Sequence, residues 1–193
     1  MKTVVRGGRD LGRCVVAVVL MGLGACAGPS TASQGGPRTL LSYGDGQPQS
    51  VLAFPDMAYE ALIRFDVPEH SLPPSRLWYR PASPGLFQIT FYESSGLDGP
   101  GKPLWETRRE VSLAASGPAT SGRWMTEELG EAPLKGQATL WVGFRKLGDS
   151  PGLWCSDKDA GHYYMRSSDP ARHVSLVPVR RTPLVQLEFV PAR

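Results

Sequence analysis

The 193-residue chain contains no asparagine and very few of the residues that commonly build reactive sites. Without asparagine, the chain has no acceptor for N-linked glycosylation. It has three histidines, and neither a His-x-x-x-His nor a Cys-x-x-Cys pair occurs, so a zinc site has no local sequence support. No strand-to-helix Gly-x-Ser-x-Gly elbow and no glycine-rich phosphate loop are predicted. The sequence therefore shows no recognisable catalytic machinery.

Long apolar runs are also absent. The longest, Cys14–Leu23, is shorter than the ~20 residues that a membrane-spanning helix requires. Basic residues precede this run, and the small residues Gly24 and Ala25 follow it. A basic segment, an apolar segment and small residues in this order are typical of an export signal. They predict a signal peptide over residues 1–25.

The end of this segment, Leu23-Gly24-Ala25-Cys26, resembles the lipobox of bacterial lipoproteins. The resemblance implies cleavage before Cys26 and a diacylglycerol on its sulfur. Each buried methylene of an acyl chain contributes ~0.8 kcal/mol, so such a group would hold the chain in a leaflet. Ala27 follows in place of an aspartate, which in this resemblance implies the outer membrane of a bacterial cell envelope. The alternative is an ordinary secretory signal cut near Ala25 or Ala27, with Cys26 incidental.

The net charge of the chain depends on that segment. Residues 1–25 hold four of the 21 basic and one of the 18 acidic side chains, which leaves 17 of each and no formal net charge. A basic footprint is therefore missing, and we expect no nucleic-acid partner. Of the three cysteines, Cys14 leaves with the signal, Cys26 carries the lipid, and Cys155 has no disulfide partner. Because Cys155 follows Trp154, we expect a buried, apolar-like side chain.

The rest of the chain divides into a tether and one domain. Residues 26–38 are rich in small residues and proline, which predicts a flexible tether with a reach on the order of 20 Å. Residues 39–191 have the length of a single domain. Frequent glycine and proline, with short runs of β-branched and aromatic residues, indicate an all-β domain. Eight or more strands in this length predict a two-sheet antiparallel β-sandwich, jelly-roll-like, or a barrel.

Alternation of apolar and polar residues locates the individual strands. It is clearest at Tyr59–Asp66, Phe87–Tyr92 and Leu184–Phe189. Leu140–Phe144 is almost wholly apolar and is expected to be a central strand covered on both sides. Weaker strands are predicted at residues 40–43, 77–80, 105–113, 123–127, 161–166 and 174–179. One helical turn is expected around Glu127-Glu128-Leu129, kept short by Gly130 and Pro133.

Glycines and aromatic residues predict further local features. Gly44-Asp45-Gly46 supplies the positive φ angles that a tight turn needs. Gly143, inside an apolar strand, predicts a bulge or a close backbone approach. Four aromatic side chains are expected to fill the space between the two sheets: Phe65, Phe91, Trp124 and Phe144.

Several short segments resemble the galactose-binding-like and carbohydrate-binding-module jelly rolls of secreted envelope proteins. They are Ser42–Gly46, Ala61–Phe65, Gln88–Tyr92, Gly122–Trp124 and Trp141–Phe144. The resemblance spans most of residues 42–190 and implies a jelly-roll fold. None of the segments is a catalytic signature, and the resemblance says little about a ligand.

Aromatic side chains are the first candidates for ligand binding, because flat rings stack against sugar rings. The candidates for an exposed face are Trp78, Tyr79, Tyr92, Trp105, Trp154, Tyr163 and Tyr164. Among them, the predicted ligand-binding residues are Trp78, Tyr92, Trp105, Trp154 and Tyr163. The alternative is that most of these rings belong to the core.

Two carboxylates are candidates for a metal site. Asp157 and Asp159 lie two residues apart and close to Gly161, an arrangement that can aim oxygens at a hard cation. The resemblance to jelly rolls, which often carry a structural Ca²⁺, makes Ca²⁺ the expected ion. The alternative is an acidic hairpin turn without an ion.

Together these observations predict a lipid-anchored, non-enzymatic envelope lipoprotein. Its β-sandwich is expected to bind a glycan or an envelope protein, at the cell surface or in the periplasm. The alternative is a structural subunit of an envelope complex for secretion, motility or adhesion, which contacts its partners through sheet edges or loops. A hydrolase would need a pocket with at least two convergent titratable groups.

Overall fold

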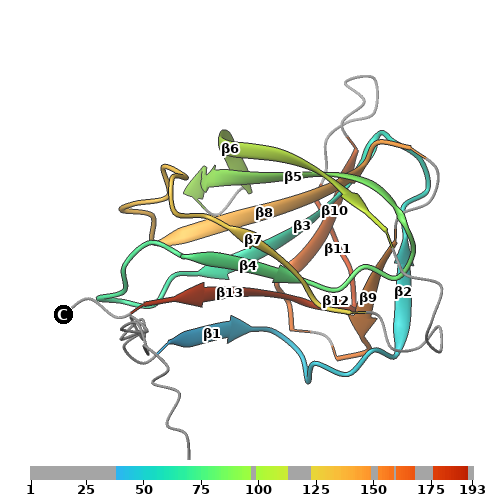
Figure 1. Ribbon diagram of the computed structural model, residues 1–193, viewed down its shortest axis with the longest axis horizontal. Coiled ribbons are helices and arrows are strands. Elements are labelled where there is room, and N and C mark those ends of the chain that lie inside the picture. Colours follow the sequence, from blue (N-terminus) through green and yellow to red (C-terminus); the bar gives the residue numbers. More distant parts are fainter. Residues whose placement is uncertain are drawn as a thin grey trace, which may run out of the picture. The chain divides into compact units, whose positions relative to one another are not determined.

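The computed structural model describes residues 38–96, 99–112, 123–148, 152–158, 160–167 and 176–190 (Figure 1). These residues form strands and no α-helix, so the expected all-β class is confirmed. Among them, no helix has the length and hydropathy needed to cross a bilayer. The strands are β1 (Thr39–Ser42), β2 (Ser50–Ala53), β3 (Tyr59–Asp66), β4 (Arg76–Tyr79), β5 (Gly85–Ser94), β6 (Pro100–Val111), β7 (Met125–Glu128), β8 (Thr139–Lys146), β9 (Gly152–Ser156), β10 (Tyr163–Ser167), β11 (Val177–Pro178), β12 (Thr182–Pro183) and β13 (Val185–Phe189).

Two antiparallel sheets form the sandwich. One has the strand order β1-β13-β4-β7, and the other has the order β11-β10-β3-β8-β5-β6. Eight strands, β1, β3 to β8 and β13, make up the jelly roll. Of these eight, β1, β13, β4 and β7 form the four-stranded sheet, and β3, β8, β5 and β6 belong to the other sheet. Numbered one to eight along the chain, the two sets have the orders 1-8-3-6 and 2-7-4-5. This exchange of strands between two sheets is the jelly-roll topology.

The segment between β8 and β13 adds to this framework. β10 and β11 extend the second sheet to six strands. β9 pairs with both β12 and β2 in a small three-stranded sheet, seen at the right of Figure 1. Gly44 and Gly46, in the connection from β1 to β2, have φ angles of 89° and 72°. The positive φ angles predicted for these glycines are therefore confirmed.

The core lies between the inner faces of the two main sheets. Three of the four aromatic side chains expected to fill this space are fully buried there, namely Phe65, Phe91 and Phe144. Trp124, the fourth expected core ring, is only half-buried. Burial of each large side chain stabilises the fold by roughly 1.5–3 kcal/mol. The core therefore fixes which face of each strand points outward.

The predicted helical turn at Glu127-Glu128-Leu129 is wrong. Residues 125–128 form β7, which pairs with β4 at the edge of the four-stranded sheet. Glu127 points inward, where the hydroxyl of Tyr79 and the guanidinium of Arg109 hold its carboxylate. Contacts between distant strands therefore override the local preference of this segment.

The prediction for Gly143 is only partly correct. β8 keeps a continuous register with both neighbours at this residue, so no bulge occurs there. The register shift lies in the pairing of β5 with β6, on either side of Tyr92. The close approach at Gly143 is made by side chains, because a Cβ there would overlap the carboxylate of Glu60 and come within 2.9 Å of the Tyr92 ring.

Candidate functional site

The outer face of the six-stranded sheet carries a buried carboxylate. Glu60 on β3 is 4% exposed, and its Oε1 accepts a hydrogen bond of 2.7 Å from the Tyr92 hydroxyl on β5. Its Oε2 accepts one of 2.7 Å from Nε of Arg166 on β10. The Arg166 guanidinium also lies 4.8 Å from the centre of the Tyr92 ring. Three strands therefore contribute side chains to one network, in which the partners of Glu60 are an aromatic residue and a charged one.

Gly143 makes this network geometrically feasible. It lies on β8 between β3 and β5, so Glu60 and Tyr92 meet directly above it. The pairing of β5 with β6 shifts register on either side of Tyr92, and irregularities of this kind redirect side chains. Burial, followed by the negative charge of Glu60, raises the pKa of Tyr92. The hydroxyl therefore stays protonated and keeps donating to Glu60 at physiological pH.

A pair of aromatic rings lies beside the network on the same face. Trp141 on β8 is 3% exposed, and its ring centre lies 5.3 Å from that of Tyr164. The Tyr164 hydroxyl donates to the carbonyl oxygen of Gly161 at 3.2 Å. The indole Nε1 of Trp141 is buried and has no hydrogen-bond partner among the described residues. This N–H is the unsatisfied donor of the face.

The five predicted ligand-binding aromatics are not brought together. Tyr92 belongs to the network described above. Trp78 lies on the four-stranded sheet, where its Nε1 donates to Glu188 at 3.1 Å. Trp105 packs edge-on against Phe91, Trp154 lies in the three-stranded sheet, and Tyr163 is 2% exposed in the core. Tyr163 and Trp105 are paired with inward residues across the sheet, a relationship that becomes visible only when the register is known.

Of the two predicted calcium ligands, only Asp157 belongs to the residues that the structure describes. Asp157 accepts a hydrogen bond of 2.8 Å from Ser50, and its N–H donates to Gln49. These contacts join β2 to the end of β9. Asp159 lies outside the described residues. No group of three or more histidine, cysteine or acidic side chains suited to a metal ion occurs in the described part of the chain.

One pattern escaped the sequence reasoning. Gly148–Gly152 has the letters of a Gly-x-Ser-x-Gly segment, but it connects strand β8 to strand β9. A nucleophile elbow connects a strand to a helix, so this segment lacks the required context. Residues 149–151, including Ser150, lie outside the described residues.

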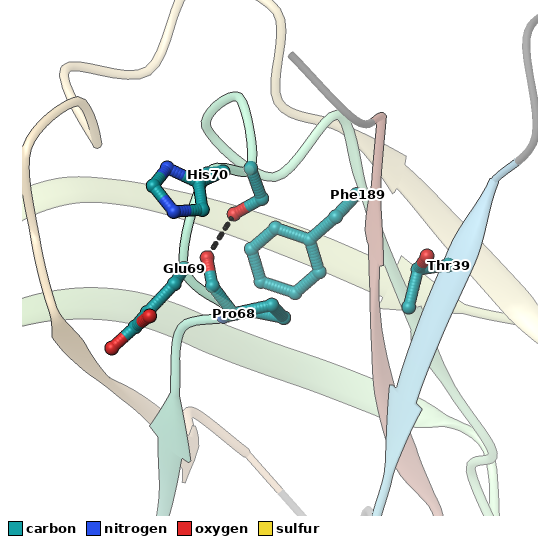
Figure 2. Close-up of a pocket in the computed structure, with 6 residues that line it drawn as sticks. Thr39, Pro68, Glu69, His70 and Phe189 are labelled. Carbon is teal, nitrogen blue, oxygen red and sulfur yellow. Dashed lines mark hydrogen bonds between the residues drawn. The ribbon is translucent and has the colours of Figure 1, made fainter.

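A hollow of about 90 Å³ lies at the end of the sandwich where β1 begins. Its floor is the ring of Phe189, which Figure 2 shows between Thr39 and the turn at Pro68–His70. The hydroxyl of Ser71 donates to the carbonyl oxygen of Pro68 at 2.8 Å and closes that turn. An engineered cavity of roughly 150 Å³ holds benzene, so the hollow suits a single aliphatic side chain rather than a sugar ring.

The hollow has an unusual backbone at its rim. His70 has a φ of 59°, and it is the one non-glycine residue with positive φ in the described part of the chain. An L-residue in this conformation is strained by ~1–2 kcal/mol. His70 and its neighbour Glu69 are exposed. Strain of this kind is concentrated at functional positions, which marks this turn as a candidate recognition element.

β1, beside the hollow, has a free edge. It is the outermost strand of its sheet and pairs only with β13 among the described strands. Its four residues carry no charge and no proline, and Leu40 is 53% exposed. By contrast β6, one of the two edge strands of the other sheet, contains two prolines and five charged residues that discourage pairing.

No family model, curated protein or solved structure matches this chain.

Proposed function

We propose that this chain is a lipid-anchored, non-enzymatic envelope protein that binds another envelope protein at the end of its β-sandwich. The observation that carries the proposal is the juxtaposition of an uncharged free strand edge with an open hollow, both of which include Thr39. Free edges are usually blocked by charge, proline or a covering segment. An unblocked edge beside a side-chain-sized hollow is typical of a surface that recognises a protein.

The predicted anchor agrees with this proposal. Cys26 precedes Thr39 by a short tether, so a lipid on Cys26 would keep the hollow on the order of 20 Å from the headgroups. A partner in the same leaflet would then meet the hollow at a high effective concentration. The anchor is tested by Cys26→Ser, which should move the protein from the membrane to the soluble fraction after cell disruption. Retention of the variant in the membrane would contradict lipidation.

Site-directed photocrosslinking in intact bacterial cells tests the binding surface. A photoreactive amino acid at Leu72, which is 47% exposed and follows Ser71 of the hollow, should form one discrete crosslinked species. The matched control is Met57, which is 59% exposed in the turn between β2 and β3. Crosslinks of equal yield from both positions, or from neither, would contradict the proposal.

Glycan binding on the six-stranded sheet is a second candidate function. It is favoured by the partly exposed ring of Tyr164, which packs on the buried Trp141 ring and offers a stacking surface on this face. Titration calorimetry against purified envelope polysaccharides tests it. Tyr164→Ala should lower the affinity at least tenfold, and Trp78→Ala on the opposite sheet should leave it unchanged. An absence of saturable heat with every polysaccharide would eliminate this function.

A further inference from the structure

Two arginines on the outer face of the six-stranded sheet have no carboxylate partner among the described residues. The register places Arg108 on β6 and Arg145 on β8 on either side of Gln88 on β5. A guanidinium N–H of Arg145 donates to Oε1 of Gln88. In the part of the chain that the structure describes, no salt bridge reaches either arginine. Two positive charges therefore flank one glutamine without a counterion.

The carboxylate opposite Arg145 on β3 is already occupied. Glu60 is the cross-strand partner of Arg145, but its two oxygens accept hydrogen bonds from Tyr92 and Arg166. The Glu60 carboxylate also lies over Gly143, two residues along β8 from Arg145. The guanidinium of Arg145 instead contacts Gln88, on the side of β8 that faces away from Glu60. Glu60 therefore serves Arg166 and leaves the charge of Arg145 unpaired.

Gln88 is nine-tenths buried and still has donors to offer. The residue is 8% exposed, and its Oε1 accepts the bond from Arg145. No described residue accepts a hydrogen bond from its amide nitrogen, and that nitrogen is not enclosed, so its N–H groups reach solvent. A glutamine amide has two N–H donors, and a guanidinium has five and no acceptor. The three side chains therefore present donors alone, which is what a bound anion requires.

The spacing of the strands suits one anion held from both sides. Neighbouring strands lie ~4.8 Å apart, so the backbones of Arg108 and Arg145 are separated by roughly 10 Å. Both side chains are long enough to reach an anion that lies between them, above Gln88. Tyr164 on β10 belongs to the same face, two strands beyond β8. An extended polymer can therefore contact the Tyr164 ring and the arginines together.

We infer that the glycan of the second candidate function is acidic, and that one of its carboxylates binds between Arg108 and Arg145 above Gln88. This inference rests on the proposed glycan binding and names the class of polysaccharide. Glu106 and Glu110 lie on the same face of β6, two residues to either side of Arg108, and both are exposed. They would repel the charge of −1.5 to −2 that a phosphate group carries. A singly charged carboxylate is therefore favoured over a phosphate.

Titration calorimetry of the intact protein in detergent micelles tests the inference with polygalacturonate, a polymer of uronic acids. Its methyl ester, which has the same backbone without the charges, should bind at least tenfold more weakly. Arg145→Gln should lower the affinity for polygalacturonate at least tenfold. The matched control is Arg64→Gln on the same face, where Arg64 already pairs with Asp66, and this variant should stay within twofold of the parent. The affinity of the parent should fall as the salt concentration rises.

A further variant separates ligand binding from a purely structural role. Gln88→Glu places a carboxylate of nearly the same shape between the two arginines and supplies the counterion that they lack. It should abolish the binding of polygalacturonate and raise the urea midpoint of unfolding. A role confined to stability would improve with this change and would not alter binding, so a variant that binds polygalacturonate as the parent does would overturn the inference.

The ligands separate this inference from the function on which it rests. Binding of the methyl ester or of neutral polysaccharides that equals the binding of polygalacturonate would overturn the carboxylate site and leave glycan binding standing. No binding to any of these polymers would overturn glycan binding itself. Tighter binding to a phosphorylated mannan than to polygalacturonate would overturn the choice of a carboxylate.

Discussion

The hydroxyl of Tyr79 donates a hydrogen bond of 3.3 Å to Oε1 of Glu127, as the hydroxyl of Tyr92 does to Glu60 on the other sheet. Glu188 is held in a similar way by Trp78 and Arg38. All three glutamates are 4% exposed, and each has an arginine and an aromatic donor as partners. Burial of a carboxylate is costly unless it is paired and hydrogen-bonded. The fold therefore depends on three carboxylates that are each satisfied by residues from other parts of the chain.

The first prediction concerns the charge of Glu60. Glu60→Gln leaves Arg166 without its carboxylate partner in a site where both side chains are largely buried, at 5% and 20% exposure. Breaking a buried ion pair costs about 3–5 kcal/mol, and the partial exposure of Arg166 places this variant at the lower end. Urea unfolding should show that loss. Asp66→Asn, which breaks an exposed pair with Arg64, should cost less than about 1 kcal/mol. Equal losses in the two variants would contradict the special role of Glu60.

The second prediction concerns the space above Gly143. Gly143→Ala places a methyl group against the Glu60 carboxylate and the Tyr92 ring, so the two side chains must separate. Overpacking of this kind costs typically 1–3 kcal/mol. Gly130→Ala is the matched control, because a Cβ there meets no atom within 4 Å. Thermal unfolding should show a lower midpoint for Gly143→Ala alone. An unchanged midpoint would mean that the Glu60–Tyr92 contact can shift at no cost.

The third prediction concerns alkaline pH. Burial raises the pKa of the Cys155 thiol from 9.0 to about 12. Because the folded value is the higher one, this contribution to stability is fully present below pH 9 and is lost as the pH rises toward 12. Between pH 8 and pH 10.5 the thiol should account for a loss of about 2 kcal/mol. Urea titrations of the parent and of Cys155→Ala at both pH values measure it as the difference between their pH dependences. Parallel dependences would contradict the raised pKa.

The fourth prediction concerns the backbone of His70. Glycine adopts positive φ without steric cost, so His70→Gly should raise the free energy of unfolding by about 0.5–1 kcal/mol. Glu69→Gly, at the adjacent exposed residue whose φ is not positive, should instead lower it by a similar amount. Chemical unfolding of both variants provides the measurement. A loss of stability in His70→Gly would show that contacts of the imidazole outweigh the backbone strain.

The fold was predictable because buried residues recur at regular intervals in the sequence. Phe65 and Phe91 belong to runs in which apolar and polar residues alternate, and this period-two pattern defines strands and their inward faces without any knowledge of their neighbours. The buried position of Cys155 followed in the same way, from its apolar neighbour and its lack of a disulfide partner. Such features are encoded within a few consecutive residues.

The sites were less predictable because they depend on register and on distant partners. The sequence alone predicts that Glu127 is a surface residue. Its burial depends on Tyr79 and Arg109, which come from two other strands. The hollow combines Thr39, the turn at Pro68–Ser71 and Phe189, three segments that share no motif. Strand polarity alone could not place Tyr163 in the core, because both faces of β10 carry aromatic residues. Lipidation of Cys26 and the calcium site at Asp157 and Asp159 stay predictions.

The pairing of Thr39 with Phe189 brings the two ends of the folded unit together as hydrogen-bonded neighbours. A short peptide could therefore join them covalently, and new ends could be opened at an exposed turn such as the one that contains Met57. In such a rearranged chain, an anchor attached in front of the domain or behind it would emerge from the same place. The domain could therefore be inserted into a host protein, or be anchored through its C-terminal side, and the end of the sandwich that holds the hollow would keep its orientation.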